Sequence, residues 1–180
     1  MYLCTQMFGL EPYIIDLKAL KDKGLHLDFA IDDDFFERVE ATLVRRGRLN
    51  VGLDIQKISG YFELKFHTEG VVTLACDLCL DDMEVPVKSD NLLTVTLGDE
   101  YEENDDLVTV PSDEGTIDVA WFIYEFIALS VPIRHVHAPG KCNEAMIRIL
   151  AEHSAARSSE EQKEDIDPRW NKLKKLTFKK

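Results

Sequence analysis

The sequence has little of what many enzymes and membrane proteins require. Its nine glycines are scattered among turns and form no loop that could cradle a phosphate. No apolar run approaches the roughly 20 residues that cross a bilayer; the longest, 119–131, contains Glu125 and is closed by Pro132. Residues 1–10 lack the basic and apolar regions of a signal peptide. The sequence therefore predicts a cytoplasmic protein with no membrane partner and no small-molecule substrate.

Positive charge is also scarce, and much of it lies at one end of the chain. The 180 residues include 34 acidic and 21 basic side chains, which gives a net charge of −13. The segment 169–180 contains no acid and six basic residues, namely Arg169, Lys172, Lys174, Lys175, Lys179 and Lys180. Because affinity for nucleic acid depends largely on neutralising phosphates, the acidic remainder would repel RNA and attract basic partners. Solubility alone is the simpler explanation of this charge.

What the chain does contain is a set of short segments in which apolar and polar residues alternate. Hydrophobic residues make up 45% of the sequence, enough to form a core. Turn signals at 59–60 and 69–70 separate some of the segments. Strands this close together predict an antiparallel meander. The alternating segments are 24–30, 48–55, 61–66, 71–76, 83–87 and 93–97.

Two helices are predicted after these strands. Asp118 is a suitable N-cap for the first helix, and Pro132 ends it because proline cannot continue the hydrogen-bonding pattern. Asn143 is a suitable N-cap for the second helix. One face of that helix would carry Met146, Ile147 and Leu150.

The expected organisation is an α+β fold, with an antiparallel β-sheet meander followed by two helices and a basic C-terminal tail. A single domain is predicted over residues 1–168 and the tail over 169–180. Within the domain, the acidic segment near 98–115 is expected to be a mobile loop with a strand-like patch at 107–110. The polar segment 154–167 is expected to be a linker.

Two of the four cysteines form a C-x-x-C motif, Cys76 and Cys79, at the end of a predicted strand. Two thiols at this spacing can bind one tetrahedral ion. Cys142 and His137 would complete a set of three sulfurs and one nitrogen that suits zinc, with His135 as the alternative nitrogen ligand. Four protein ligands leave no position for water, so a zinc ion bound here would be structural rather than catalytic.

Other interpretations of these residues remain open. The cysteines could be ordinary half-buried thiols, because a cytoplasmic chain keeps thiols reduced. A thioredoxin-like redox pair fits less well, since the motif does not open a helix in a βαβ unit. The aspartate clusters 32–34 and 81–82 are interpreted as solvated acids, and a magnesium-dependent hydrolase or nuclease is the enzymatic alternative. No nucleophile with a paired base is found, so no catalytic residue and no enzymatic activity are predicted.

Four motifs follow one another in an order that is typical of one protein family. They are the C-x-x-C-L strand end in 72–80, Ile117-Asp118 followed by the helix end 126–132, the later His137 and Cys142, and the terminal segment that starts with Asp167-Pro168-Arg169-Trp170. In these respects residues 24–176 resemble the YceD-like family of large ribosomal RNA subunit accumulation proteins. One residue differs, because Leu78 stands where many members have arginine.

The resemblance implies a bacterial, non-enzymatic factor that supports the synthesis, processing or stability of large-subunit ribosomal RNA. Its direct partner would be that RNA or its precursor, or else a basic ribosomal protein held without RNA contact. In the first case, the tail would touch phosphates while Trp170 stacks on a base. The tail residues predicted to contact RNA are Arg169, Trp170, Lys172, Lys174 and Lys175. Alternatively, Trp170 docks on the sheet with Leu173 and Leu176, and the lysines extend into water.

Overall fold

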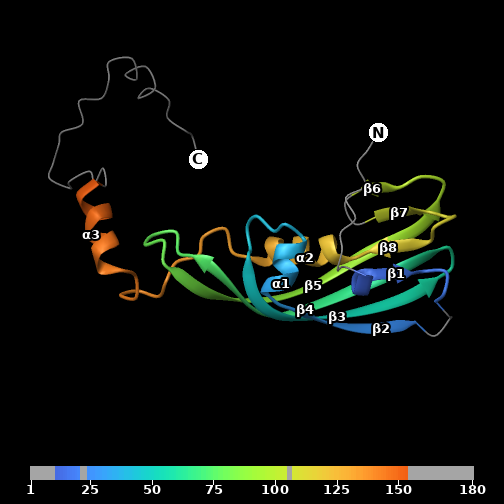
Figure 1. Ribbon diagram of the computed structural model, residues 1–180, viewed down its shortest axis with the longest axis horizontal. Coiled ribbons are helices and arrows are strands. Elements are labelled where there is room, and N and C mark those ends of the chain that lie inside the picture. Colours follow the sequence, from blue (N-terminus) through green and yellow to red (C-terminus); the bar gives the residue numbers. More distant parts are fainter. Residues whose placement is uncertain (1–10, 21–23, 105–106, 154–180) are drawn as a thin grey trace, which may run out of the picture. The chain divides into compact units, whose positions relative to one another are not determined.

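The structure is a computed structural model that describes residues 11–20, 24–104 and 107–153 (Figure 1). The chain divides into two units, Met1–Asn143 and Glu144–Lys180, and each is described by itself. The described part is mixed α+β, as predicted, with a mostly antiparallel sheet. In the first unit the elements are a 3-10 turn (Glu11–Tyr13), β1 (Ile14–Asp16), β2 (Leu25–Ile31), α1 (Asp33–Arg38), β3 (Arg46–Ile58), β4 (Tyr61–Ala75), β5 (Asp82–Gly98), β6 (Glu102–Asn104), β7 (Leu107–Pro111), β8 (Thr116–Asp118) and α2 (Ala120–Ser130).

The main sheet has six strands in the order β2-β3-β4-β5-β7-β6. Strands β2 to β5 form an antiparallel meander of four long strands rather than the six short ones predicted, because 61–66 and 71–76 lie in β4 and 83–87 and 93–97 lie in β5. Strand β7 pairs with β5 in parallel, and β6 pairs with β7 antiparallel. These two strands lie in the segment expected to be a mobile acidic loop; β7 confirms its predicted strand-like patch at 107–110, whereas β6 was not predicted. Val108 and Val110 are buried, which places apolar β7 beside β5, and the acidic β6 takes the edge, where charge discourages pairing with other chains. A separate pair, β1 and β8, is antiparallel.

Strand β4 is longer than the sequence suggested, because no turn occurs at 69–70. The pairing of β4 with β3 and β5 continues through Gly70, so that predicted turn is wrong, whereas the chain does turn at 59–60 between β3 and β4. A Cβ atom at Gly70 would lie 2.3 Å from the carbonyl oxygen of Arg48 and 2.5 Å from Cα of Leu49. The glycine therefore marks a close approach of two backbones rather than a change of direction.

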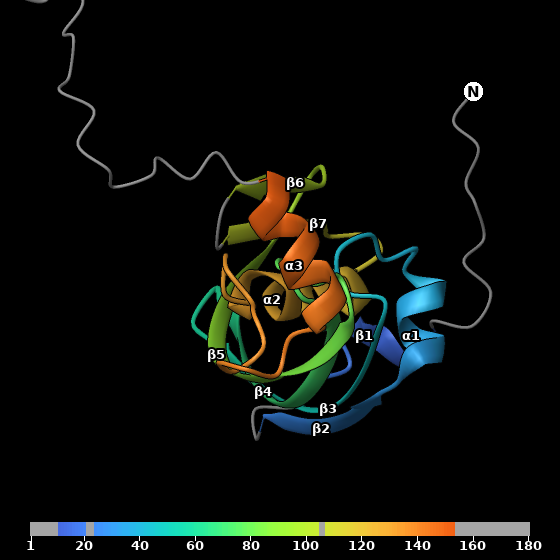
Figure 2. The same cartoon turned by 90° about the vertical axis from the view of Figure 1, so that its left-hand side faces the viewer.

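The core lies between the inner face of the sheet and α2. Strands β3, β4 and β5 curve around this helix (Figure 2). The Phe66 ring of β4 meets the Phe126 ring of α2 edge to face at 5.1 Å between centroids, and Ile123 and Ile127 are fully buried. Alternate residues of the strands supply the other side of the core, among them Val51, Leu53, Leu64, Leu93 and Val95.

Helix α2 ends where the sequence predicts, but its N-cap is Val119 rather than the predicted Asp118. The Asp118 carboxylate accepts a hydrogen bond from the Ala120 backbone N–H at 2.9 Å, which satisfies a donor of the first turn. The last helical residue is Ser130, two residues before Pro132.

The described part of the second unit is α3 (Glu144–His153), which starts directly after Asn143. None of its residues is buried. The predicted linker 154–167, the boundary at 168 and the basic tail 169–180 lie outside the described residues. Among the helices that the structure describes, none is long and apolar enough to span a membrane.

Candidate metal centre

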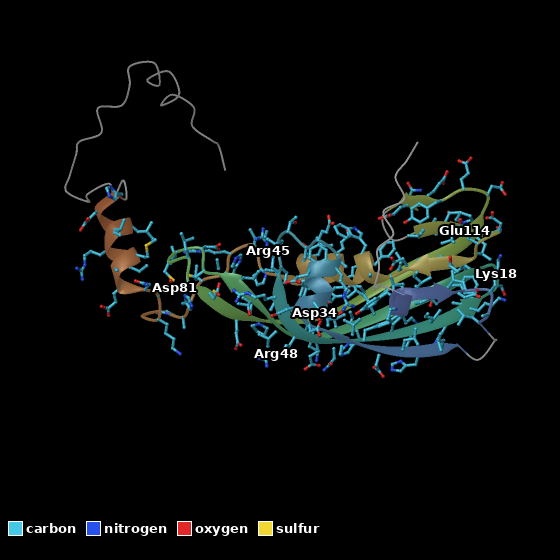
Figure 3. The ribbon with its side chains drawn as sticks, in the orientation of Figure 1. Lys18, Asp34, Arg45, Arg48, Asp81 and Glu114 are labelled. Atoms are coloured by element: carbon cyan, nitrogen blue, oxygen red, sulfur yellow. The ribbon has the colours of Figure 1, made fainter. Side chains whose placement is uncertain are left out.

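The C-x-x-C motif forms the turn between β4 and β5. The Cys76 N–H donates to the Asp81 carbonyl at 2.9 Å, and the Leu80 N–H donates to the Cys76 carbonyl at 2.9 Å. Leu80 has a positive φ of 63°, which a tight turn of this kind requires. As a result, both thiols point inward, with Cys76 0% and Cys79 1% exposed. Asp81 lies at this end of the sheet, and Lys18 and Glu114 lie at the other (Figure 3).

The segment that follows α2 returns to this turn and supplies the other two candidate ligands. The Asp77 N–H donates to the His135 carbonyl at 3.0 Å, and the His135 N–H donates to the Asp77 carboxylate at 2.8 Å. Farther along, the Asn143 side-chain amide donates to the Asp81 carboxylate at 3.2 Å. These bonds bracket His137 and Cys142 and hold them against the turn.

The four predicted ligands come together in the structure. Sγ of Cys76 lies 3.9 Å from Sγ of Cys142, and Sγ of Cys79 lies 3.3 Å from Nδ1 of His137. Nδ1 of His137 lies 4.0 Å from Sγ of Cys142, and all four ligand atoms lie within 4.8 Å of one another. A tetrahedral zinc ion needs about 3.8 Å between two sulfurs and about 3.5 Å between a sulfur and a nitrogen. The donor atoms therefore fit zinc in number, type and spacing.

The structure also decides between the two candidate histidines. The His135 ring is turned away from the sulfurs, with Nδ1 3.2 Å from the Pro132 carbonyl and Nε2 3.5 Å from the Asp77 carboxylate. His137 is the histidine beside the thiols.

The electrostatic environment differs between the thiols. Burial raises the pKa of Cys76, but backbone N–H groups of Cys79, His137 and Leu78 that point at the sulfur outweigh it and lower the pKa to about 6. Burial, together with the neighbouring Cys76 and Cys79, raises the pKa of Cys142 to about 11. Metals bind thiolates, and hydrogen bonds to sulfur are the kind of support that ligands receive in metal sites.

Sequence reasoning missed the residues that support this centre. Asp77 and Asn143 were not expected to contribute, and Asp81 was interpreted as part of a solvated acid cluster. The carboxylate of Asp81 holds Asn143 instead, and that of Asp82 pairs with Arg46. The only sequence signal that Asp77 would support the centre was its position inside the C-x-x-C motif.

In the other aspartate cluster, residues 32–34, two carboxylates accept hydrogen bonds from backbone N–H groups. Asp32 caps α1 by accepting from the Phe35 N–H at 3.2 Å, and Asp33 accepts from the Gly47 N–H at 2.9 Å. Among the described residues, the cysteine and histidine set forms the one group with the spacing of metal ligands. The tail residues predicted to contact RNA, 169–175, lie outside the described residues.

Comparison with known proteins agrees with the resemblance noted from the motifs. Residues 64–177 match the family model described as "Large ribosomal RNA subunit accumulation protein YceD", and they make up more than half of the chain. The chain belongs to the YceD family. The matched residues include all four ligands of the candidate metal centre, α2 and α3, whereas β2 and β3 of this YceD-family chain precede the match. No curated protein and no solved structure matches the chain.

Proposed function

We propose that this YceD-family protein supports the accumulation of large-subunit ribosomal RNA as a non-enzymatic factor. The observation that carries the proposal is the family match over residues 64–177, because the family is described by that role. The cysteine and histidine cluster within the match favours a structural site over a catalytic one, since its four donors already satisfy a tetrahedral ion.

Zinc is the ion that this centre would bind. Cys76 and Cys79 would hold it from the β4–β5 turn, and His137 and Cys142 from the segment after α2. The ion would then join two parts of the chain that are 66 residues apart. Its binding energy would contribute directly to folding, as in other small zinc sites.

The basic tail is the part of the chain that we propose contacts RNA. Its phosphate ligands would be Arg169, Lys172, Lys174 and Lys175, and Trp170 would stack on an unpaired base. The acidic remainder of the chain would not compete for phosphate. A basic ribosomal protein is the alternative direct partner. Unchanged RNA binding after deletion of 169–180, at a stated salt concentration, would refute the tail contact.

The decisive experiment is the ratio of large- to small-subunit ribosomal RNA in cells that lack the gene. We expect a selective fall of the large-subunit RNA that the intact gene restores and that a gene carrying Cys76→Ser restores poorly. An unchanged ratio would refute the proposed function. Nuclease treatment before a pull-down then separates the two partners, because contact through RNA is lost and contact with a basic protein is retained.

A further inference from the structure

Helix α2 is apolar on both of its sides. Its sequence, AWFIYEFIALS, contains one charged residue, Glu125. The inner side is buried in the core through Phe122, Ile123 and Ile127. A helix at the surface of a protein usually carries polar residues on its outer side, so an apolar outer side requires an explanation.

The outer side of α2 is a row of three residues spaced four apart. Trp121 is 53% exposed, Leu129 is 74% exposed, and Glu125 lies half-buried between them. Residues at this spacing lie one above the other on a helix, so the row presents an aromatic ring, a carboxylate and an aliphatic side chain in succession.

Exposed apolar residues also lie just after the helix and beside Tyr124. Ile133, just past Pro132, is fully exposed, and Leu43 is 55% exposed. Leu43 is tied to the helix because its N–H donates to the Tyr124 hydroxyl at 3.1 Å, and the Trp121 ring packs on Tyr124 at 5.2 Å. We call Leu43, Trp121, Glu125, Leu129 and Ile133 the α2 surface. Exposed apolar residues on and around one helix are typical of interaction sites.

The charge of the α2 surface indicates what would cover it. Glu125 has no hydrogen-bond or ion-pair partner among the residues that the structure describes, and α2 contains no basic residue. A partner that covered the row with apolar groups alone would bury this carboxylate unpaired, at a high cost. A basic side chain would pair with Glu125 and could also lie over the ring of Trp121.

We propose that the α2 surface is the docking site for a basic, amphipathic segment of a large-subunit ribosomal protein. This inference rests on the proposed function, which brings the chain to ribosomal components. A lysine or arginine of the partner would meet Glu125, and apolar side chains on either side of it would cover Trp121 and Leu129. RNA would be repelled by the carboxylate. A second copy of the chain, related by two-fold symmetry, would place like charges against each other.

Site-directed crosslinking tests the proposal. A photo-crosslinking amino acid replaces Leu129 in the full chain, and the probe is the protein fraction extracted from purified large ribosomal subunits and freed of RNA. The control position is Leu92, which is 46% exposed and lies on the opposite face of β5 from buried Leu93. We expect position 129 to capture a basic ribosomal protein that mass spectrometry identifies, and position 92 to capture none.

Affinity for the captured protein provides the second measurement. Because Leu129 and Glu125 lie outside the core, Leu129→Asp and Glu125→Lys should leave thermal unfolding unchanged and weaken binding by about tenfold or more, the loss of a central contact. Leu92→Asp is the matched control and should bind like the unchanged protein. Equal affinity of all three variants would overturn the proposal.

Three crosslinking outcomes would also overturn it. They are capture of residues 169–180 of the same chain, capture of a second copy, and capture of RNA when large-subunit RNA is added. The proposed function can fail independently. An unchanged ribosomal RNA ratio in cells that lack the gene, with specific capture at position 129, would refute the function and leave the docking site standing.

Discussion

Asp77 and His135 hold each other through two hydrogen bonds across 58 residues of sequence, each donating its backbone N–H to the other residue. The Asp77 N–H bonds the His135 carbonyl, and the His135 N–H bonds the Asp77 carboxylate. This pairing attaches the segment after α2 to the C-x-x-C turn through the protein's own bonds. The candidate metal ligands are therefore brought near one another by groups outside the candidate set.

The zinc content of the purified protein checks the ligand set directly. We expect about one zinc ion per chain by elemental analysis, and loss of the metal in Cys76→Ser, because three remaining ligands bind zinc much more weakly. Cys4→Ser is the matched control, since Cys4 is outside the predicted set, and it should keep the metal. Metal-free protein with four titratable thiols would contradict the prediction.

Removal of the metal should destabilise the fold. An ion present at about 1,000 times its dissociation constant stabilises the folded state by about 4 kcal/mol. For a chain of this size, that free energy corresponds to a fall in melting temperature of about 8–16 °C on chelation. Differential scanning calorimetry with and without a chelator measures it. A melting temperature that does not respond to the chelator, in protein shown to contain zinc, would count against a structural role.

Asp77→Ala should weaken zinc binding without changing its stoichiometry. The substitution removes the acceptor for the His135 N–H and so loosens the segment that carries His137 and Cys142. Loss of such supporting contacts typically costs about 10- to 100-fold in metal affinity, which competition with a chromogenic chelator would measure. Asp90→Ala removes another aspartate that pairs with a histidine, His67, and should leave zinc affinity unchanged.

Gly70→Ala should destabilise the sheet by about 2 kcal/mol or more, in the range seen for overpacked sites. The added Cβ would meet backbone atoms of β3 at 2.3 and 2.5 Å, and backbone cannot move aside as a flexible side chain can. Gly52→Ala is the control in the neighbouring strand, because its Cβ would meet the His26 ring at an ordinary 3.6 Å. Urea unfolding of both variants gives the comparison, and equal stabilities would contradict the prediction.

His26 should titrate above its ordinary pKa of 6.5. Its Nδ1 lies 2.7 Å from the Asp54 carboxylate, and this hydrogen bond, together with the negative charges of Asp54 and Asp28, raises the pKa, while slight burial opposes it. The folded-state pKa is the higher one, so the small stabilisation is present below pH 6.5 and is lost as the pH rises through the folded value. Asp54→Asn should lower the pKa in an NMR titration, and an unchanged pKa would contradict this account.

The candidate metal centre was predictable from the sequence because few residue types can form it. Cys76 and Cys79, with two residues between them, form the only C-x-x-C motif, and Cys142 is the only other cysteine beyond the first few residues. The choice between His135 and His137 was not predictable. Only Val136 lies between them, and the structure places His137, not His135, beside the sulfurs, while His135 bonds Asp77.

The sheet was predictable where the pattern is local and uncertain where partners are distant in sequence. Alternating residues determined β2 to β5, because each strand pairs with the next along the chain. The parallel pairing of β7 with β5 depends on Val108 and Val110 reaching the core, and local alternation does not record that contact. Gly70 was mispredicted for a similar reason, because the sequence does not distinguish a glycine in a turn from a glycine at a close approach of two backbones.

The sequence by itself determined the α+β class, the C-terminal end of α2, the three candidate sulfur ligands and the family, because these depend on local spacing and on residue chemistry. Only the tertiary structure decided that His137 rather than His135 lies beside the thiols, that Asp77 and Asp81 bond the segment on either side of it, and that α2 keeps an apolar side exposed. Each of these depends on which segments, far apart in the chain, the packed core brings together, and residue spacing carries no record of that.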